Sequence, residues 1–297
     1  MANLTRLKRL YWNWRRKRRR IRPDDVPAPF FHASTINDVH EYFSTQHADT
    51  NFFQDAQLLR NSKCFVCNAL VKFSVNLPMD GSPVNWRETL TCPKCELINR
   101  WRGCVHVFEA VCEPSVNDRI YMTETLSPLY QNLASRFPFL SASEFLPEGE
   151  LGSLVKAKGV TVRNEDVTQL TFRNRSFESI LCFDVMEHVP DYRLALKEFF
   201  RVLSSGGQLL LSVPFSFRQE TVVRAEIDKT GHVRHLLEPS YHGDPLSNKG
   251  VLSYYDFGMD LLDELSEAGF KESFLLCYHS EQWGYLGENI VYVARKI

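Results

Sequence analysis

Hydrophobic and polar positions along the second half of the chain predict strands that alternate with helices. Short apolar runs bounded by turn residues predict seven strands, at 119–124, 139–143, 159–165, 179–185, 207–214, 271–279 and 289–296. Amphipathic segments predict helices at 127–137, 150–159, 191–207 and 255–269, the third of which is expected to end on its glycines. This alternation is typical of an α/β fold with a parallel sheet and crossover helices.

Composition indicates an ordinary globular protein with one large and one small domain. The chain has 297 residues, of which 44% are hydrophobic and 24% are charged. No apolar run is long enough to cross a bilayer, and the first residues lack the pattern of a signal peptide. We therefore expect a cytoplasmic protein.

The net charge of −1 conceals a basic first segment, residues 1–23. Residues 1–22 hold ten Lys and Arg and no acidic residue, and apolar positions recur in it at helical spacing. Such an amphipathic arm can bind an anionic membrane surface, RNA phosphates or an acidic protein partner. A disordered solubilising arm is the alternative. The membrane interpretation would place the protein at the periphery of the inner membrane surface.

Four of the eight cysteines form two C-x-x-C pairs, Cys64 with Cys67 and Cys92 with Cys95. Two such turns supply the four thiolates that zinc prefers in tetrahedral structural sites. A four-thiolate site is closed to substrate, so we expect a structural zinc ion in a zinc ribbon over residues 61–103. Residues 24–60 are interpreted as a linker with helical pieces. The other cysteines are expected to be small buried hydrophobes.

Residues 177–214, FESILCFDVMEHVPDYRLALKEFFRVLSSGGQLLLSVP, carry the most specific pattern of the chain. This segment resembles the fourth strand, following helix and fifth strand of class I S-adenosylmethionine (SAM) dependent methyltransferases of the type 11 kind, here preceded by a zinc ribbon. The resemblance implies a Rossmann-like seven-stranded class I methyltransferase sheet over residues 104–297, with SAM as the cofactor.

The same resemblance implies cofactor-binding residues at the ends of successive strands. Glu144 stands where an acid typically binds both ribose hydroxyls, and Asp166 where an acid typically accepts from the adenine amine. An ionised carboxylate only accepts hydrogen bonds, which suits both groups. The full set of cofactor-binding candidates is Thr123, Glu124, Thr125, Glu144, Asp166, Val167, Asp184 and His188.

The first strand departs from the family pattern, because RIYMTETLSP has no glycine where the family has a glycine-rich loop. A turn is still expected there, since Ser127 suits a helix N-cap and Pro128 the first helical position. Glu144 and Asp166 could alternatively cap the turns that follow them.

A loop-rich insertion at residues 215–254 is expected to form the acceptor site, because loops at the carboxyl ends of the strands build binding sites in this fold. It holds the catalytic candidates, with His242 and Asp244 as the first pair and His232 and His235 as further candidates. A histidine base would deprotonate an acceptor oxygen or nitrogen. A second metal ion or plain loop contacts are the alternatives.

The predicted function is methyl transfer from SAM to an oxygen or nitrogen of a small-molecule or glycan acceptor. An RNA methyltransferase that uses the basic arm and the zinc ribbon is the first alternative. A non-catalytic methyltransferase-fold protein that serves binding or assembly is the second, and the missing glycines favour it. The sequence does not indicate an oligomeric state.

Overall fold

The computed structural model describes residues 27–47, 62–76, 84–243 and 250–297. The predicted basic arm and Asp244 lie outside these ranges. Among the helices that are described, none has the length and apolar character needed to cross a membrane.

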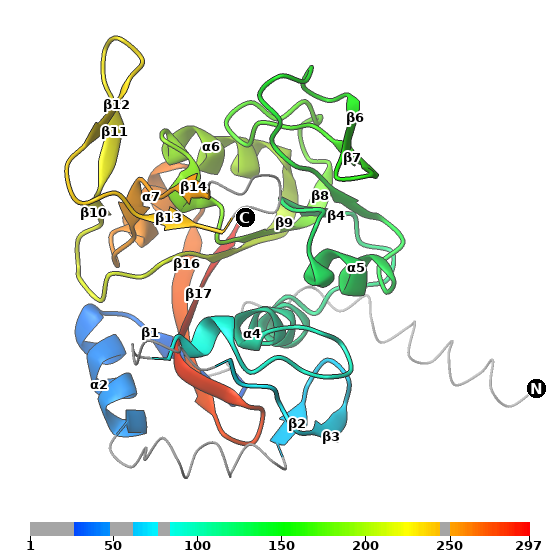
Figure 1. The fold of residues 1–297 in the computed structure, drawn as a ribbon, viewed down its shortest axis with the longest axis vertical. Coiled ribbons are helices and arrows are strands. Elements are labelled where there is room, and N and C mark those ends of the chain that lie inside the picture. Colours follow the sequence, from blue (N-terminus) through cyan, green and yellow to red (C-terminus); the bar gives the residue numbers. More distant parts are fainter. Residues whose placement is uncertain (1–26, 48–61, 77–83, 244–249) are drawn as a thin grey trace, which may run out of the picture.

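A seven-stranded mixed sheet forms the centre of the fold, in the order β1-β16-β17-β9-β8-β4-β5 (Figure 1). Its parallel part comprises β4 (Ile120–Met122), β5 (Leu140–Ala142), β8 (Phe177–Phe183) and β9 (Leu203–Ser212). The antiparallel part comprises β17 (Tyr285–Arg295), β16 (Glu272–Ser280) and β1 (Phe30–Ala33). The predicted Rossmann-like α/β sheet is confirmed.

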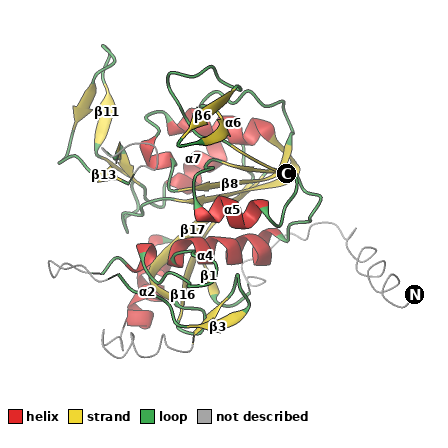
Figure 2. Cartoon of the chain, turned by 45° about the vertical axis from the view of Figure 1, so that its right-hand side comes forward, coloured by secondary structure: helices red, strands yellow, loops and turns green. Residues whose placement is uncertain are grey.

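Helices cover both faces of this sheet (Figure 2). One face packs against α2 (Ile36–His47), α6 (Tyr192–Val202) and α7 (Leu261–Glu267), the other against α4 (Asn99–Val107), its π-helical continuation η4 (Phe108–Cys112) and α5 (Pro128–Ala134). In β8, Ile180 and Cys182 point into the first core and Leu181 and Phe183 into the second. A strand buried on both faces explains the continuous apolar run of 180–183.

Two strand assignments differ from the sequence prediction. Residues 159–165 contain β7 (Val160–Arg163), which pairs with β6 (Leu154–Ala157) in a hairpin separate from the sheet. Asn164, directly after β7, forms an isolated parallel bridge with Glu144, which lies just beyond β5. The seventh strand of the sheet is β1, from the segment expected to be a linker. Pairing of β1 with β16 depends on residues almost 250 positions apart, so local pattern could not reveal it.

The predicted helix at 150–159 is wrong, because this segment holds β6. Lys158 and Gly159 have φ of +48° and +83°, which makes a tight turn that joins β6 to β7. The cross-strand pair of Val155 and Val162 then stabilises the hairpin.

The predicted helix at 191–207 ends early, at Val202. Leu203 is extended and pairs with Phe177 in the sheet, and both side chains are buried. The glycines that were expected to cap the helix therefore lie inside β9, where Gly206 has φ of +75°. By contrast, α5 begins as predicted, since the Ser127 hydroxyl accepts from the Tyr130 amide and Pro128 follows it.

The insertion after β9 forms short two-stranded ladders instead of an irregular loop. These are β10 (Val222–Val223) with β15 (Tyr255–Asp256), β11 (Ala225–Ile227) with β12 (Val233–His235), and β13 (Tyr241–His242) with β14 (Val251–Leu252). The last ladder lies beside η5 (Met186–His188), the turn that follows β8.

The cysteine-containing segment, with β2 (Ser62–Cys64), β3 (Ala69–Val71) and η3 (Trp86–Glu88), is joined to the sheet by α4. The fully buried Arg102 of α4 donates to the carbonyls of Leu90 (3.1 Å), Trp283 (2.8 Å) and Gly284 (2.8 Å). The last two carbonyls belong to the turn between β16 and β17. The predicted domain boundary between residues 103 and 104 falls inside α4.

Candidate cofactor and metal sites

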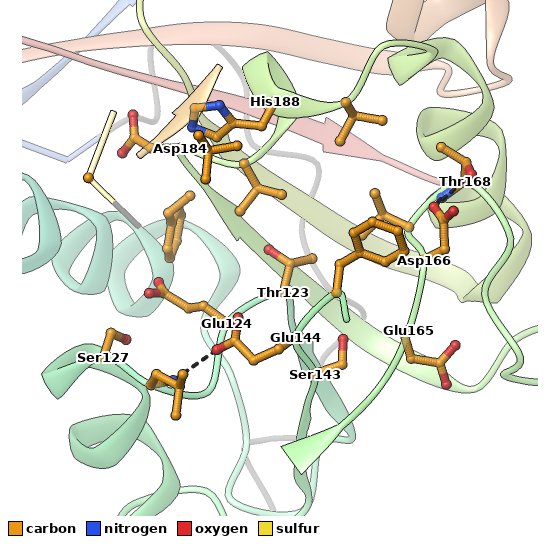
Figure 3. A pocket seen from close by; sticks show the side chains of 18 of the residues that line it. Thr123, Glu124, Ser127, Ser143, Glu144, Glu165, Asp166, Thr168, Asp184 and His188 are labelled. Atoms are coloured by element: carbon orange, nitrogen blue, oxygen red, sulfur yellow. Dashed lines mark hydrogen bonds between the residues drawn. The ribbon is translucent and has the colours of Figure 1, made fainter. Parts of the chain in front are cut away.

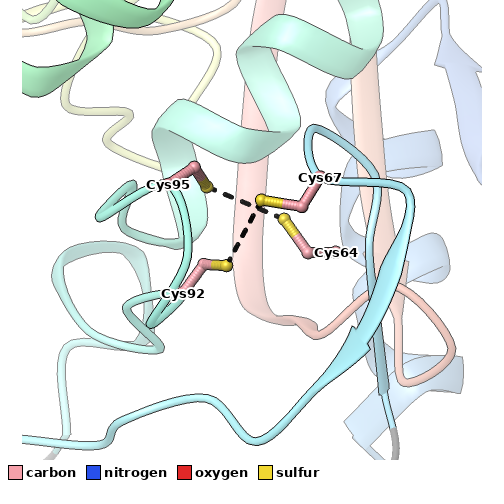
Figure 4. Close-up of side chains that lie close together, drawn as sticks. All are labelled: Cys64, Cys67, Cys92 and Cys95. Atoms are coloured by element: carbon pink, nitrogen blue, oxygen red, sulfur yellow. Dashed lines mark hydrogen bonds between the residues drawn. The ribbon is translucent and has the colours of Figure 1, made fainter.

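The four cysteines of the two C-x-x-C pairs converge (Figure 4). Cys64 Sγ lies 3.8 Å from Cys95 Sγ, and Cys67 Sγ lies 3.8 Å from Cys92 Sγ. Four sulfurs that surround one zinc ion at about 2.3 Å are about 3.8 Å apart in a tetrahedron. The donor set and its spacing therefore fit a closed structural zinc site. The other four cysteines, Cys104, Cys112, Cys182 and Cys277, are buried thiols.

A cavity of about 790 Å³ opens at the carboxyl ends of β4, β5 and β8 (Figure 3). Ligands of open α/β sheets bind at this edge, and the volume is typical of a small-molecule site. Of the predicted cofactor-binding residues, all but Thr125 line it. They are Thr123, Glu124, Glu144, Asp166, Val167, Asp184 and His188.

The glycine-free first loop is fixed by the second loop. Glu144 Oε1 accepts from the amides of Thr125 (2.6 Å) and Leu126 (3.0 Å). Through these bonds Glu144 supports the backbone after β4 while its carboxylate lines the cavity. This second role of Glu144 was not predicted from sequence.

Glu124 is a cavity acid whose pKa is raised far above its ordinary value. Burial raises the pKa of Glu124 to about 7, although the Ser127 hydroxyl and the charge of Arg100 act in the opposite direction. Its Oε1 is buried and has no hydrogen-bond partner among the described residues. A carboxyl group that is half-ionised near neutral pH therefore stands where the family has glycine.

Asp166 follows β7 and adopts an Asx turn. Its Oδ1 accepts from the Thr168 amide (2.8 Å) and hydroxyl (2.7 Å). The turn orients the Asp166 carboxylate at the cavity wall opposite Glu124 (Figure 3). The predicted capping role and a ligand-binding role are thus compatible at this residue.

Asp184, at the end of β8, forms ion pairs with two arginines. Arg87 Nη2 lies 2.9 Å from Oδ1, Arg100 Nη1 lies 2.6 Å from Oδ2, and the Ser212 hydroxyl donates to Oδ2 (3.0 Å). Burial alone would raise the pKa of Asp184, but Arg100 and Arg87 hold it well below its ordinary value. Asp184 is therefore ionised, and both of its carboxylate oxygens already bind side chains of this chain.

Arg100 and Trp101 also line the cavity, and sequence reasoning missed them. Both follow the second C-x-x-C pair closely, at the start of α4. The only local signal was the basic-aromatic run NRWRG directly after Cys95. The cysteine module thus contributes side chains to the cavity wall.

On the side of the insertion, His242 meets Glu187 and His188. Its Nδ1 lies 3.4 Å from Glu187 Oε1, and its ring packs edge to face against His188, with centroids 5.0 Å apart. The predicted partner Asp244 lies outside the described residues. Glu187, buried behind His188, was not among the predicted site residues.

The structure does not bring His232 and His235 to this site. Both are exposed on the β11–β12 hairpin, where His232 Nδ1 lies 2.8 Å from the Thr230 hydroxyl. Neither residue lines the large cavity. Of the four predicted catalytic residues, only His242 is placed beside it by the described part of the chain.

Residues 145–211, from the loop after β5 to the end of β9, match the family model described as "Methyltransferase domain". The sheet and its flanking helices match the Rossmann-like fold of class I methyltransferases. This match supports SAM-dependent methyltransferase activity for the chain. No curated protein matches the chain.

Solved methyltransferase structures resemble the chain at low sequence identity. An S-adenosylmethionine dependent methyltransferase from Mesorhizobium loti is 14% identical, with a TM-score of 0.44, and the match covers 68% of this chain and 100% of that one. The 1,6-didemethyltoxoflavin-N1-methyltransferase of Burkholderia thailandensis, solved with S-adenosylhomocysteine, is also 14% identical, with a TM-score of 0.42 and coverage of 66% and 78%.

Proposed function

We propose that the protein binds SAM in the 790 Å³ cavity and transfers its methyl group to an oxygen or nitrogen of a small-molecule or glycan acceptor. The observation that carries this proposal is the convergence of acids from three successive loops. Glu124 follows β4, Glu144 follows β5 and Asp166 follows β7, and all three line the same cavity. SAM presents a diol, an exocyclic amine and cationic centres, which are groups that carboxylates recognise.

The adenosine part is proposed to lie between Glu144 and Asp166. The Asp166 carboxylate would accept from the adenine amine, and Glu144 would accept from the ribose hydroxyls. The bridge between Glu144 and Asn164 holds the second and third loops side by side, which supports simultaneous contact with both parts of one nucleoside.

The methionine part is proposed to lie between Glu124 and Arg100. An α-amino acid carries an ammonium and a carboxylate, and these two side chains offer one charge of each sign at one wall of the cavity. Ionised Glu124 would pair with the ammonium, while the guanidinium of Arg100 would attract the carboxylate. This arrangement would replace the backbone contacts of a glycine-rich loop with side-chain contacts.

The acceptor is proposed to enter from the side of His188 and the β13–β14 ladder. Gly243, which follows β13, and Val251 of β14 line the cavity together with His188. The acceptor oxygen or nitrogen would attack the methyl carbon in line with the carbon–sulfur bond, and sulfur would keep the bonding electron pair. The product would be S-adenosylhomocysteine.

Isothermal titration of SAM and S-adenosylhomocysteine into the zinc-loaded full chain tests this function. We expect micromolar binding by the wild type and at least a tenfold weaker affinity in Asp166→Ala and in Glu144→Ala. Glu148→Ala is the matched control, because Glu148 is an exposed acid of the same segment that does not line the cavity. Absence of binding by the wild type would support the non-catalytic alternative, whereas equal binding by all variants would contradict the placement of SAM beside Glu144 and Asp166.

A further inference from the structure

We propose that Glu187, His188 and His242 bind one divalent transition-metal ion, and that this ion coordinates a hydroxyl oxygen of the methyl acceptor. The role of the ion toward the acceptor depends on the proposed function, whereas the metal site itself does not. The site is separate from the four-cysteine site, since it uses imidazole and carboxylate ligands from the turn after β8 and from β13.

The spacing of the three side chains suits a single ion. Glu187 Oε1 lies 3.4 Å from His242 Nδ1 and 3.8 Å from His188 Nε2, and one potential ligand atom of each residue lies within 4.8 Å of the other two. An ion at about 2.1 Å from each ligand atom would hold neighbouring ligands about 3.0 to 3.4 Å apart. To bind one ion, the distances from Glu187 Oε1 to the two imidazole nitrogens would have to shorten by a few tenths of an ångström. The distance between the two imidazole nitrogens would have to shorten somewhat more.

Glu187 provides an independent indication of a cation. Its side chain is fully buried, and neither carboxylate oxygen forms a hydrogen bond of good geometry with a described residue, the contact with His242 Nδ1 being 3.4 Å long. A buried carboxylate without a donor or a cation is strongly disfavoured. The only cationic or cation-binding groups that the described residues place against it are the two imidazoles.

His188 presents a lone pair to the site because its other nitrogen is a donor. Nδ1 lies 2.8 Å from the Leu252 carbonyl, which can only accept, so Nδ1 carries the proton. In a neutral imidazole Nε2 is then unprotonated, and Nε2 is the atom that faces Glu187. Orientation of a ligating histidine by a backbone carbonyl is the usual outer-shell arrangement of protein metal sites.

The position of the cluster indicates what the ion would do. His188 lines the large cavity, and so does Gly243, which follows His242, so coordination positions not filled by protein face the cavity. A set of two nitrogens and one oxygen suits manganese, iron, cobalt or zinc better than magnesium or calcium. These properties favour an acceptor that carries a hydroxyl or a vicinal diol, and therefore O-methylation.

The ion would activate the acceptor hydroxyl for attack on the methyl group of SAM. Coordination lowers the pKa of the acceptor hydroxyl, whose proton passes to water. The resulting oxygen–methyl bond forms as the methyl–sulfur bond breaks, and the electron pair stays on sulfur. Neither oxidation nor reduction of the metal is involved.

The test of the site is a titration of Mn²⁺ into the full chain loaded with a single equivalent of zinc, which the four thiolates bind first, followed by electron paramagnetic resonance of the free Mn²⁺. Mn²⁺ prefers nitrogen and oxygen ligands and will not replace zinc at four thiolates. We expect one Mn²⁺ per chain in the wild type and at least a tenfold weaker affinity in Glu187→Gln and His242→Ala. His40→Ala and Glu220→Gln, at exposed residues outside both sites, should bind as the wild type does.

Water-proton relaxation of the Mn²⁺ complex tests the open coordination positions, because bound exchangeable water enhances relaxation. Failure of the wild type to bind Mn²⁺, or equal binding by Glu187→Gln and His242→Ala, would overturn the site, and binding without enhanced relaxation would overturn its role toward the acceptor. SAM titration of the same variants checks that they are folded. SAM binding without Mn²⁺ binding would refute the metal site alone, whereas the reverse result would refute the proposed function alone.

Discussion

Arg100 Nη1 lies 2.6 Å from Asp184 Oδ2, and this ion pair connects the cysteine module to the carboxyl end of β8. Arg100 comes five residues after Cys95, at the start of α4, and also contacts Glu88. Asp184 ends the strand that carries the family pattern. Any change in the position of α4 is therefore transmitted directly to the wall of the proposed cofactor cavity.

Removal of this ion pair should weaken both the fold and the cavity. The side chains of Arg100 and Asp184 are only 15% and 14% exposed, and an unpaired buried charge costs about 3 to 5 kcal/mol. Because Arg87 remains beside Asp184, we expect Arg100→Gln to lower the free energy of unfolding by about 2 kcal/mol. Urea denaturation of the single variants and of the double variant with Asp184→Asn measures the coupling. Additive effects would contradict a direct interaction.

Glu124 should make stability depend on pH. Its pKa rises from an ordinary value of 4.5 to about 7 in the fold. The folded state therefore binds more protons than the unfolded chain between these values, and stability falls as pH rises through this window. Glu124→Gln lacks this titration. We therefore expect its free energy of unfolding, relative to that of the wild type, to be about 2 kcal/mol higher at pH 8 than at pH 5.

Urea unfolding at pH 5 and pH 8 measures this effect. Glu148→Gln is the control, since Glu148 is exposed and its substitution should leave the pH dependence as in the wild type. A constant difference between Glu124→Gln and the wild type at both pH values would show that Glu124 is not the group responsible.

Loss of zinc should reduce SAM affinity as well as stability. Metal binding at four thiolates stabilises a small module outright. Since α4 follows the second C-x-x-C pair and supplies Arg100 and Trp101 to the cavity, we expect Cys92→Ser to lower the melting temperature and to weaken SAM binding at least tenfold. Elemental analysis should give one zinc fewer per chain in Cys92→Ser than in the wild type. If a zinc-free variant binds SAM with wild-type affinity, the zinc site does not support the SAM cavity and this prediction is wrong.

Gly103 should tolerate no side chain, because α4 lies close to β16 at this residue. A Cβ atom at Gly103 would lie 2.3 Å from Tyr278 Oη and 2.4 Å from Tyr278 Cε2. Both Tyr278 and its surroundings are buried, so we expect Gly103→Ala to cost about 1 to 3 kcal/mol. Thermal unfolding compared with Gly243→Ala, whose added Cβ meets nothing within 4 Å, checks this. Equal melting temperatures would contradict the close packing.

Features that depend on residues close together in the sequence could be predicted. The two C-x-x-C pairs indicated the thiolate cluster, and the Ser127-Pro128 pair indicated the start of α5. Periodicity located the strands of the sheet other than β1, and acids at strand ends located most of the cavity wall.

Features that depend on distant contacts were not predictable. The helix predicted at 150–159 competed with a cross-strand pairing between Val155 and Val162, and the pairing prevails. Arg100 reaches Asp184 across 84 positions, and the contact of Glu187 with His242 exists only because the β13–β14 ladder folds back over η5. Nothing in the neighbourhood of these residues along the chain indicates their partners.

A crystal structure of the zinc-loaded chain with S-adenosylhomocysteine would show directly whether the cavity binds the cofactor. We expect the ligand in the cavity of about 790 Å³, with adenine beside Asp166, ribose beside Glu144 and the α-ammonium beside Glu124. A ligand bound elsewhere, or an empty cavity at a concentration that saturates binding in solution, would contradict this expectation.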